Sequence, residues 1–155
     1  MAPPVPSLAR EAAAWAEGCL LVGVDEAGRG PLAGPVVAAA VVFPSGCTRP
    51  ALRGLRDSKL LPADRRETLA VRIRARACAI GVGAASVAEI DRLNIRRATA
   101  LAMRRAFCRC RTTLQGAAAL PPQLRVLVDG LPFPELGFEH DALIDGDALC
   151  CSVAA

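Results

Sequence analysis

Aromatic and histidine side chains are scarce in this chain of 155 residues, which has four Phe, one Trp, one His and no Tyr. Any core must therefore be built mainly from Val, Leu, Ile and Ala, and hydrophobic residues do supply 53% of the chain. No apolar run approaches the roughly 18 residues of a membrane-spanning helix, and the first residues lack the basic and apolar pattern of a secretory signal. The sequence therefore favours one globular domain in the cytoplasm.

Lysine is nearly absent as well, since Lys59 is the only one and arginine carries the basic charge. Residues 49–111 include sixteen basic and five acidic side chains, whereas residues 1–48 and 112–155 have net charges of −2 and −5. A basic middle between acidic ends suits a surface that meets a polyanion, with carboxylates gathered elsewhere. The same pattern also fits a solvated helix surface, so charge alone leaves nucleic-acid binding open.

Paired cysteine motifs are missing, although the chain has seven Cys. None of them forms a C-x-x-C pair, and structural zinc sites usually bring their ligands in pairs at such spacings. We interpret the cysteines as reduced, partly buried thiols of a cytosolic protein rather than as zinc ligands.

Apolar runs separated by turn residues predict a mixed α/β sheet with helices packed against it. Strands are expected at 20–24, 36–43, 79–85, 124–128 and, briefly, 141–144. Helices are expected at 7–17 with Ser7 as N-cap, at 62–77, from a capping box at Ser86 and Glu89, at 95–114, and from 146 to 155.

Two of these strands end in acidic residues, Asp25 and Glu26 after the first and Asp129 after the fourth. If the two strands are parallel neighbours, three carboxylates meet at one sheet edge, where ligands bind in α/β folds. Such a cluster needs a counter-charge, which Mg²⁺ or Mn²⁺ supplies through oxygen ligands. Because Asp25 and Glu26 would face opposite ways in a regular strand, we expect the strand to break there. Acids at strand ends are also common turn residues, so a purely structural role stays open.

A glycine-rich turn, Gly28-Arg29-Gly30, follows the first acids directly. Glycine lets a backbone approach a ligand closely, and the guanidinium of Arg29 matches a phosphate. The two nucleotide-binding alternatives do not fit. A P-loop requires Lys and then Ser or Thr after Gly28, and the spacing to Gly34 is one residue too long for a dinucleotide motif.

Several motifs in order resemble those of one family. Residues 24–40, VDEAGRGPLAGPVVAAA, resemble the N-terminal signature of ribonuclease HII. Residues 57–59 are similar to its next motif, residues 89–95 and 98–106 to its central helical motif, and residues 128–130 to its third acidic motif. The resemblance covers about residues 20–155, and agreement of several motifs in order is far more specific than any one of them.

This resemblance implies a ribonuclease H-like mixed β-sheet flanked by helices, with a catalytic domain at 20–155 after an N-terminal extension and short helix at 1–19. It implies that Asp25, Glu26 and Asp129 are catalytic ligands of Mn²⁺ or Mg²⁺, that Gly28, Arg29 and Gly30 read the ribose 2′-hydroxyl, and that Lys59 holds backbone phosphates. The implied activity is endonucleolytic: hydrolysis of the RNA strand of RNA–DNA hybrids and nicking 5′ of ribonucleotides in duplex DNA. We expect a monomer that does not bind membranes.

The last residues differ from the family pattern. Asp145 and Leu149 stand where members usually have Lys, and the family's fourth catalytic Asp, which lies farther along the last helix, has no counterpart. The resemblance therefore predicts a fold that lacks the C-terminal helical part, with Asp147 as a candidate substitute acid. The alternative is a truncated, catalytically inactive relative that at most binds nucleic acid. A non-enzymatic domain with structural acids is disfavoured by the motifs.

Overall fold

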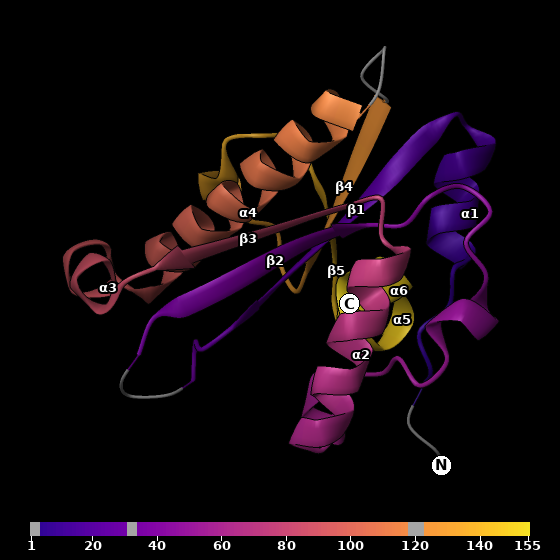
Figure 1. Cartoon of the computed structure of the whole chain (residues 1–155). Coiled ribbons are helices and arrows are strands. Elements are labelled where there is room, and N and C mark those ends of the chain that lie inside the picture. The colour runs from indigo at the N-terminus through magenta and orange to yellow at the C-terminus, as the bar shows by residue number, and fades with distance from the viewer. Residues whose placement is uncertain (1–3, 31–33, 118–122) are drawn as a thin grey trace.

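A five-stranded mixed β-sheet forms the centre of the protein, in the order β3-β2-β1-β4-β5 (Figure 1). The structure is a computed structural model that describes residues 4–30, 34–117 and 123–155. Its strands are β1 (Cys19–Ala27), β2 (Val36–Val42), β3 (Ala79–Ala85), β4 (Gln123–Asp129) and β5 (Asp141–Leu143). The pairs β1/β4 and β4/β5 are parallel, whereas β1/β2 and β2/β3 are antiparallel. The predicted mixed sheet is thus confirmed.

Helices lie on both faces of this sheet, α4 on one and α1, α2, α5 and α6 on the other (Figure 1). They are α1 (Ala9–Ala16), α2 (Ala63–Arg76), α3 (Val87–Leu93), α4 (Ile95–Ala117), α5 (Gly146–Leu149) and α6 (Cys151–Ala154), with 3-10 helices at Arg49–Leu52, Ser58–Leu60 and Pro134–Leu136. The capping box that was predicted at Ser86 and Glu89 is formed at the start of α3. Within the described ranges, no helix has both the length and the apolarity to cross a membrane.

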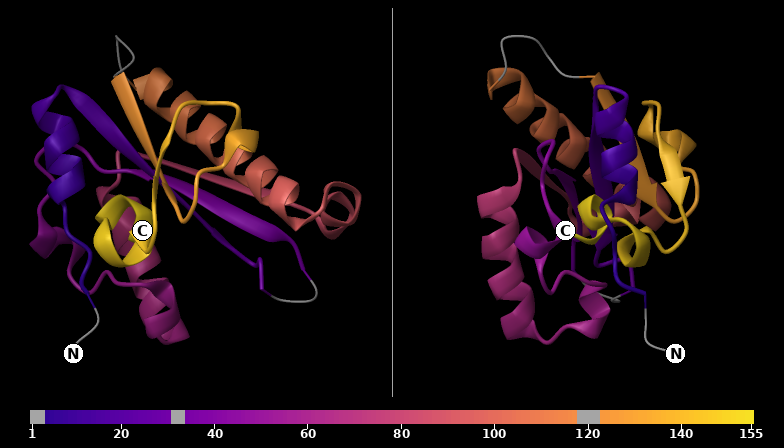
Figure 2. Two further views of the ribbon diagram at one scale, coloured as in Figure 1. Left: turned by 180° about the vertical axis from the view of Figure 1, so that it is seen from behind. Right: turned by 90° about the vertical axis from the view of Figure 1, so that its right-hand side faces the viewer.

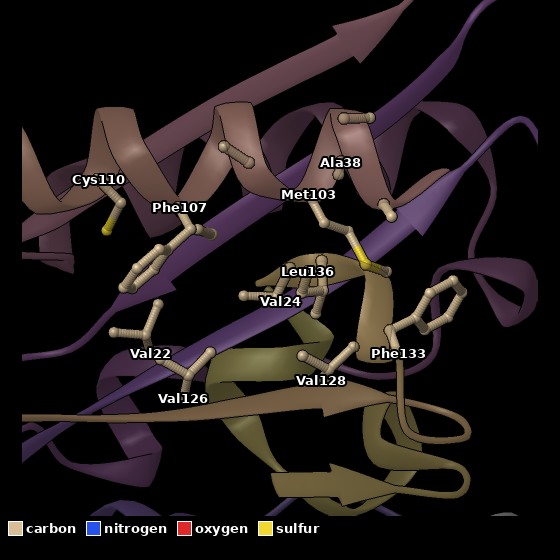
Figure 3. Packing of buried hydrophobic residues seen from close by; sticks show 14 of the residues in the cluster. Val22, Val24, Ala38, Met103, Phe107, Cys110, Val126, Val128, Phe133 and Leu136 are labelled. Carbon is tan, nitrogen blue, oxygen red and sulfur yellow. The ribbon is translucent and has the colours of Figure 1, made fainter. Parts of the chain in front are cut away.

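The main core lies between α4 and the sheet, because alternate strand residues point to this face (Figure 3). It includes Val22, Val24, Ala38, Val126 and Val128 from the strands, Met103, Phe107 and Cys110 from α4, and Phe133 and Leu136 from the loop after β4. Helix α4 approaches β3 closely because Gly81 and Gly83 have no side chains. A Cβ at either position would clash with the backbone of α4, at Ala106 or Ala102.

The opposite face is covered by α1, α2 and the C-terminal segment, residues 146–155. Val41 and Phe43 pack with residues of α2 such as Leu69, and Leu21 and Leu127 share a second cluster with residues of α1 and α6. Both views of Figure 2 show the C-terminal segment lying beside α1 and α2, although α1 comes from the other end of the chain. The two ends of the chain therefore meet on one face of the sheet.

The expected break in the first strand is wrong. Strand β1 continues through Asp25 and Glu26 to Ala27, because β2 pairs with it as far as Ala27, which lies opposite Val37. The parallel partner β4 leaves β1 earlier, at the pair Val24 and Val128. The antiparallel neighbour alone therefore keeps the acidic residues in extended conformation.

The two terminal helices also differ from expectation. Helix α1 begins at Ala9, with Leu8 rather than Ser7 in the N-cap position. Ser7 instead forms a parallel bridge with Cys150: its amide donates to the Leu149 carbonyl and its own carbonyl accepts from the Cys151 amide, both at 3.1 Å. This bridge needs Cys150 in an extended conformation, so the helix expected at 146–155 is split into α5 and α6.

Candidate active site

Asp25 and Asp129 lie side by side at the carboxyl ends of β1 and β4. The last register pair of these parallel strands is Val24 with Val128, and the two acids follow one residue later. Since Val24 and Val128 point toward α4, both acids point to the opposite face. The predicted neighbourhood of the first and fourth strand ends is therefore confirmed.

The electrostatics of Asp25 reflect this crowding. Burial raises its pKa to about 7, opposed by a hydrogen bond from the Glu26 amide and reinforced by the negative charges of Asp129, Glu26 and Asp147. A carboxyl group with such a pKa sits among like charges in a poorly solvated place.

Asp147 joins the two strand-end acids from the C-terminal segment. Its side chain is mostly buried, and burial followed by the charges of Asp57 and Asp129 raises its pKa. One residue earlier, the Gly146 amide donates a hydrogen bond of 2.6 Å to Oδ1 of Asp129. Asp25, Asp129 and Asp147 are called the carboxylate cluster below.

Lys59 brings a positive charge next to this cluster. Its Nζ lies 3.7 Å from Oδ2 of Asp147, and the charge of Asp147, followed by that of Asp57, raises the pKa of Lys59. The side chain is 81% exposed, so it can still reach a phosphate outside the protein. This position is consistent with the prediction that Lys59 lies at the site. The role of Lys59 as a phosphate ligand stays a prediction.

Glu26 does not share a face with Asp25, because β1 is continuous. Its Oε1 accepts a 3.1 Å hydrogen bond from Nη1 of Arg29. The Arg29 guanidinium in turn lies 5.9 Å from the centre of the Phe133 ring, which belongs to the core on the α4 side. The structure thus places Glu26 and Arg29 together, next to the carboxylate cluster rather than within it. These two residues and the glycine turn at 28–30 are called the rim below.

The glycine turn after β1 has one position that only glycine can fill. Gly28 has φ of +91°, and a Cβ there would lie 2.6 Å from the carbonyl oxygen of Pro35. At Gly30, a Cβ would meet no atom of the described residues within 4 Å, so this backbone is open toward solvent. Gly28 is therefore required by the turn itself, whereas Gly30 leaves space for a ligand. The motif residues 31–33 lie outside the described residues.

The carboxylate cluster has the donor chemistry of a site for a hard divalent cation. Its ligands are oxygen atoms, and a cation would offset the burial and the like charges that raise the pKa of Asp25. In the part of the chain that the structure describes, no three His, Cys, Asp or Glu side chains stand close enough to hold a metal ion by themselves. Mg²⁺ typically keeps several waters and binds through one or two carboxylates plus phosphate, so the residues present fit such an ion.

Two residues near the cluster were missed by sequence reasoning, the backbone of Gly146 and the side chain of Glu11. A backbone donor has no signal in the sequence. Glu11 does have a sequence signal: it lies on the same helical face as Leu8 and Trp15, which pack into the core, so an acid interrupts an apolar stripe.

His140 proves to be structural, since its Nε2 accepts a hydrogen bond from the Phe133 amide at 3.1 Å.

The fold and the strand-end acids define a protein of the ribonuclease H-like class. The crystal structure of ribonuclease H2 from Pyrococcus horikoshii OT3 matches with a TM-score of 0.65 at 25% identity, covering 87% of this chain and 67% of that one. Bst-RNase HIII in complex with Mn²⁺ matches with a TM-score of 0.65 at 20% identity, over 89% of this chain and 49% of that one. The expected ribonuclease H-like sheet flanked by helices is confirmed.

The family follows from sequence. A profile of the family described as Ribonuclease HII matches residues 22–131. A relative named Ribonuclease HII, from Synechococcus sp., is 49% identical over 151 residues, which is 97% of this chain and 64% of the relative. The chain belongs to the ribonuclease HII family, as its motifs predicted, and spans just under two thirds of that relative's length.

Proposed function

We propose that this chain is a divalent-metal-dependent endonuclease that hydrolyses the RNA strand of RNA–DNA hybrids and nicks 5′ of ribonucleotides embedded in duplex DNA. The observation that carries the proposal is that Asp25 and Asp129 lie side by side at the ends of β1 and β4, where burial and like charges raise the pKa of Asp25 to about 7. Membership of the ribonuclease HII family supports the same activity. We also propose that it acts as a monomer in the cytoplasm.

Asp25 and Asp129 would hold Mn²⁺ or Mg²⁺, and Glu26 and Asp147, whose charges act on Asp25, would take part directly or through water. Such ions, when bound, activate a water molecule against the phosphorus atom and stabilise the leaving 3′-oxygen. The Gly146 amide occupies one oxygen of Asp129 and so orients its other oxygen. Burial of the cluster strengthens each of these electrostatic interactions.

In this proposal the rim and Lys59 bind the substrate. Arg29 is held by Glu26 and by the Phe133 ring, so its guanidinium is oriented in advance for a phosphate. Gly28 and Gly30 bring backbone close to a ribose, where the 2′-hydroxyl separates RNA from DNA. Lys59, exposed beside the cluster, would bind a backbone phosphate without reading sequence.

The direct test is cleavage of a labelled DNA duplex with one embedded ribonucleotide, in Mn²⁺ or Mg²⁺. The chain is compared with Asp25→Asn and with Asp91→Asn, in which the same change is made at an exposed position of α3. We expect a single nick 5′ of the ribonucleotide that leaves an extendable 3′-hydroxyl. Asp25→Asn should lose at least about a hundredfold in rate, because misplaced reacting groups have effects of this size, while Asp91→Asn should retain activity.

Binding without cleavage is the second candidate function. It is favoured by the lack of a complete three-residue metal site among the described residues and by the basic segment 49–111. The same duplex, titrated in a gel-shift assay at two salt concentrations, separates the two candidates. Salt-sensitive binding with no nicking by the chain would support the binding protein and contradict the nuclease.

A further inference from the structure

Glu11, in α1, is a fully buried carboxylate, and its side-chain hydrogen bonds within the described residues all come from the C-terminal segment. Its Oε1 accepts hydrogen bonds from the Ser152 amide at 2.7 Å, the Ser152 hydroxyl at 2.8 Å and the Cys150 thiol at 3.3 Å. Its side chain has 0% exposure, and its Oε2 has no hydrogen-bond partner among the described residues. One oxygen atom therefore carries all of the polar contacts of this acid.

A buried carboxylate is destabilising unless hydrogen bonds compensate it. Here the compensation comes from two residues of one segment, which concentrates the stabilising contacts on α6. The Cys150 thiol is a permanent donor in this arrangement, since burial and the charge of Glu11 raise its pKa to about 12. Moving α6 away would leave Glu11 buried without these donors, so Glu11 and α6 constrain each other's positions.

The segment that Glu11 holds packs against β1 on the same face of the sheet to which Asp25 and Asp129 point. Gly23, two residues before Asp25, has no side chain at the point where the Ser152 backbone lies against β1, and a Cβ there would clash with it. The same short segment starts at Gly146 and Asp147, which contact Asp129 and Lys59. The contacts with Glu11 and the contacts with the carboxylate cluster therefore belong to one short segment, residues 146–152.

We propose that Glu11 is a positioning residue of the active site: it holds α6 against β1 and so keeps the Gly146 amide on Asp129 and Asp147 beside Lys59. The inference deepens the proposed nuclease function and rests on it for the catalytic meaning of the carboxylate cluster. Glu11 itself touches neither Asp25 nor Asp129 and acts through Ser152 and Cys150.

The first test reads the geometry without any activity. In the full chain without metal, the amide proton resonance of Gly146 and its hydrogen exchange are measured in Glu11→Ala and Glu11→Gln. Glu17→Gln is the matched control, because Glu17 caps the same helix from an exposed position, where it pairs with Arg125. In Glu11→Ala we expect the Gly146 resonance to move upfield and exchange at Gly146 and Ser152 to rise at least about tenfold. Amides of β3 and α4 should be unchanged.

Glu11→Gln should show a smaller change, because the amide keeps one acceptor oxygen for Ser152. This variant, together with Ser152→Ala, also decides the matter if Glu11→Ala does not fold. If Glu11 acts through Ser152, the combined Glu11→Gln and Ser152→Ala effects on Gly146 exchange should be non-additive. The proposal would be overturned if every Glu11 variant that folds had the same Gly146 resonance and exchange rate as Glu17→Gln.

The second test separates this inference from the nuclease proposal. With the ribonucleotide-containing duplex, Glu11→Gln should lower kcat several-fold and change KM less, since Arg29 and the glycine turn are not among the groups that Glu11 holds. The positioning role would be overturned if Glu11→Gln perturbed the Gly146 amide but kept the kcat of the Glu17→Gln control. If the unmodified chain neither cleaves nor binds metal, the proposed function fails, and the Gly146 resonance alone then decides whether Glu11 fixes this geometry.

Discussion

The backbone amide of Gly146 and the carboxylate of Asp129 form a 2.6 Å hydrogen bond that joins the C-terminal segment to the end of β4. A Cβ at Gly146 would lie 3.0 Å from that same carboxylate oxygen and 3.1 Å from Cγ1 of Val153. Both distances are tighter than ordinary van der Waals contact. One added methyl group at Gly146 should therefore displace the Asp129 side chain.

Gly146→Ala should weaken Mn²⁺ binding and slow cleavage about tenfold, which is typical when a residue that orients a metal ligand is changed. The fold should persist, because Val153 and a side-chain oxygen can each shift by a few tenths of an ångström. Isothermal titration with Mn²⁺ and a urea unfolding curve measure the two effects. Unaltered Mn²⁺ affinity in a folded variant would show that Asp129 is not held by this contact.

The close approach of α4 to β3 gives a prediction about stability. Gly81→Ala places a Cβ against the backbone of Ala106 and Cys110, which cannot move without shifting the whole helix. We expect the free energy of unfolding in urea to fall by about 1–3 kcal/mol.

The matched change is Gly116→Ala, in the last turn of the same helix, where a Cβ meets no described atom within 4 Å. This variant should be equally stable or gain up to about 1 kcal/mol, because Ala favours a helix over Gly. Equal effects of the two substitutions would contradict the packing of α4 on the glycines of β3.

Much of this fold was predictable because local signals were strong. The strand at Ala79–Ala85 alternates, and the capping box at Ser86 marks the start of α3, so the bounds of this strand and the start of this helix were predicted to the residue. The break in the last helix was not predictable, because it depends on a bridge between Ser7 and Cys150, far apart in the sequence. The continuity of β1 likewise depends on its pairing with β2 rather than on its own residues.

The raised pKa of Asp25 predicts an unusual pH dependence of stability in the metal-free protein. The folded state binds a proton at Asp25 more tightly than the unfolded state, with a pKa of about 7 against 3.8. Unfolding free energy should therefore fall as pH rises from about 4 through 7. Asp25→Asn, which cannot ionise, should be more stable than the unmodified chain at pH 8, by up to roughly 4 kcal/mol.

Urea unfolding with a chelator present, at pH 5 and pH 8, measures this difference. The gap between the two proteins should be large at pH 8 and small at pH 5. A gap independent of pH would mean that Asp25 is not desolvated among like charges.

Glu89 predicts the opposite trend at acidic pH. Hydrogen bonds from Arg105 and from the Ser86 amide lower the pKa of Glu89 to about 2. The ionised side chain therefore contributes stability that is complete above about pH 4.5 and is lost as pH falls toward 2. Glu89→Gln should be less stable than the unmodified chain at pH 7, and thermal unfolding should show the difference vanishing near pH 2. A difference that persists at pH 2 would assign the effect to packing instead of charge.

The candidate site was predictable in its strand-end residues but not in its support. Asp25 and Asp129 follow apolar runs, so the topology of parallel strands brings them together as expected. Glu26 was expected in the same cluster, and only the continuous strand reveals that it turns toward Arg29. The contribution of Gly146 comes from a backbone amide, which no residue pattern encodes.

A titration with Mn²⁺, followed by the loss of the free-ion electron paramagnetic resonance signal, tests most directly whether Asp25 and Asp129 jointly hold a divalent cation. The unmodified chain should bind Mn²⁺, Asp25→Asn and Asp129→Asn should each weaken binding by at least about tenfold, and Asp91→Asn should bind as the unmodified chain does. Equal Mn²⁺ affinity in all four proteins, or no binding by the unmodified chain, would contradict a metal site at the ends of β1 and β4.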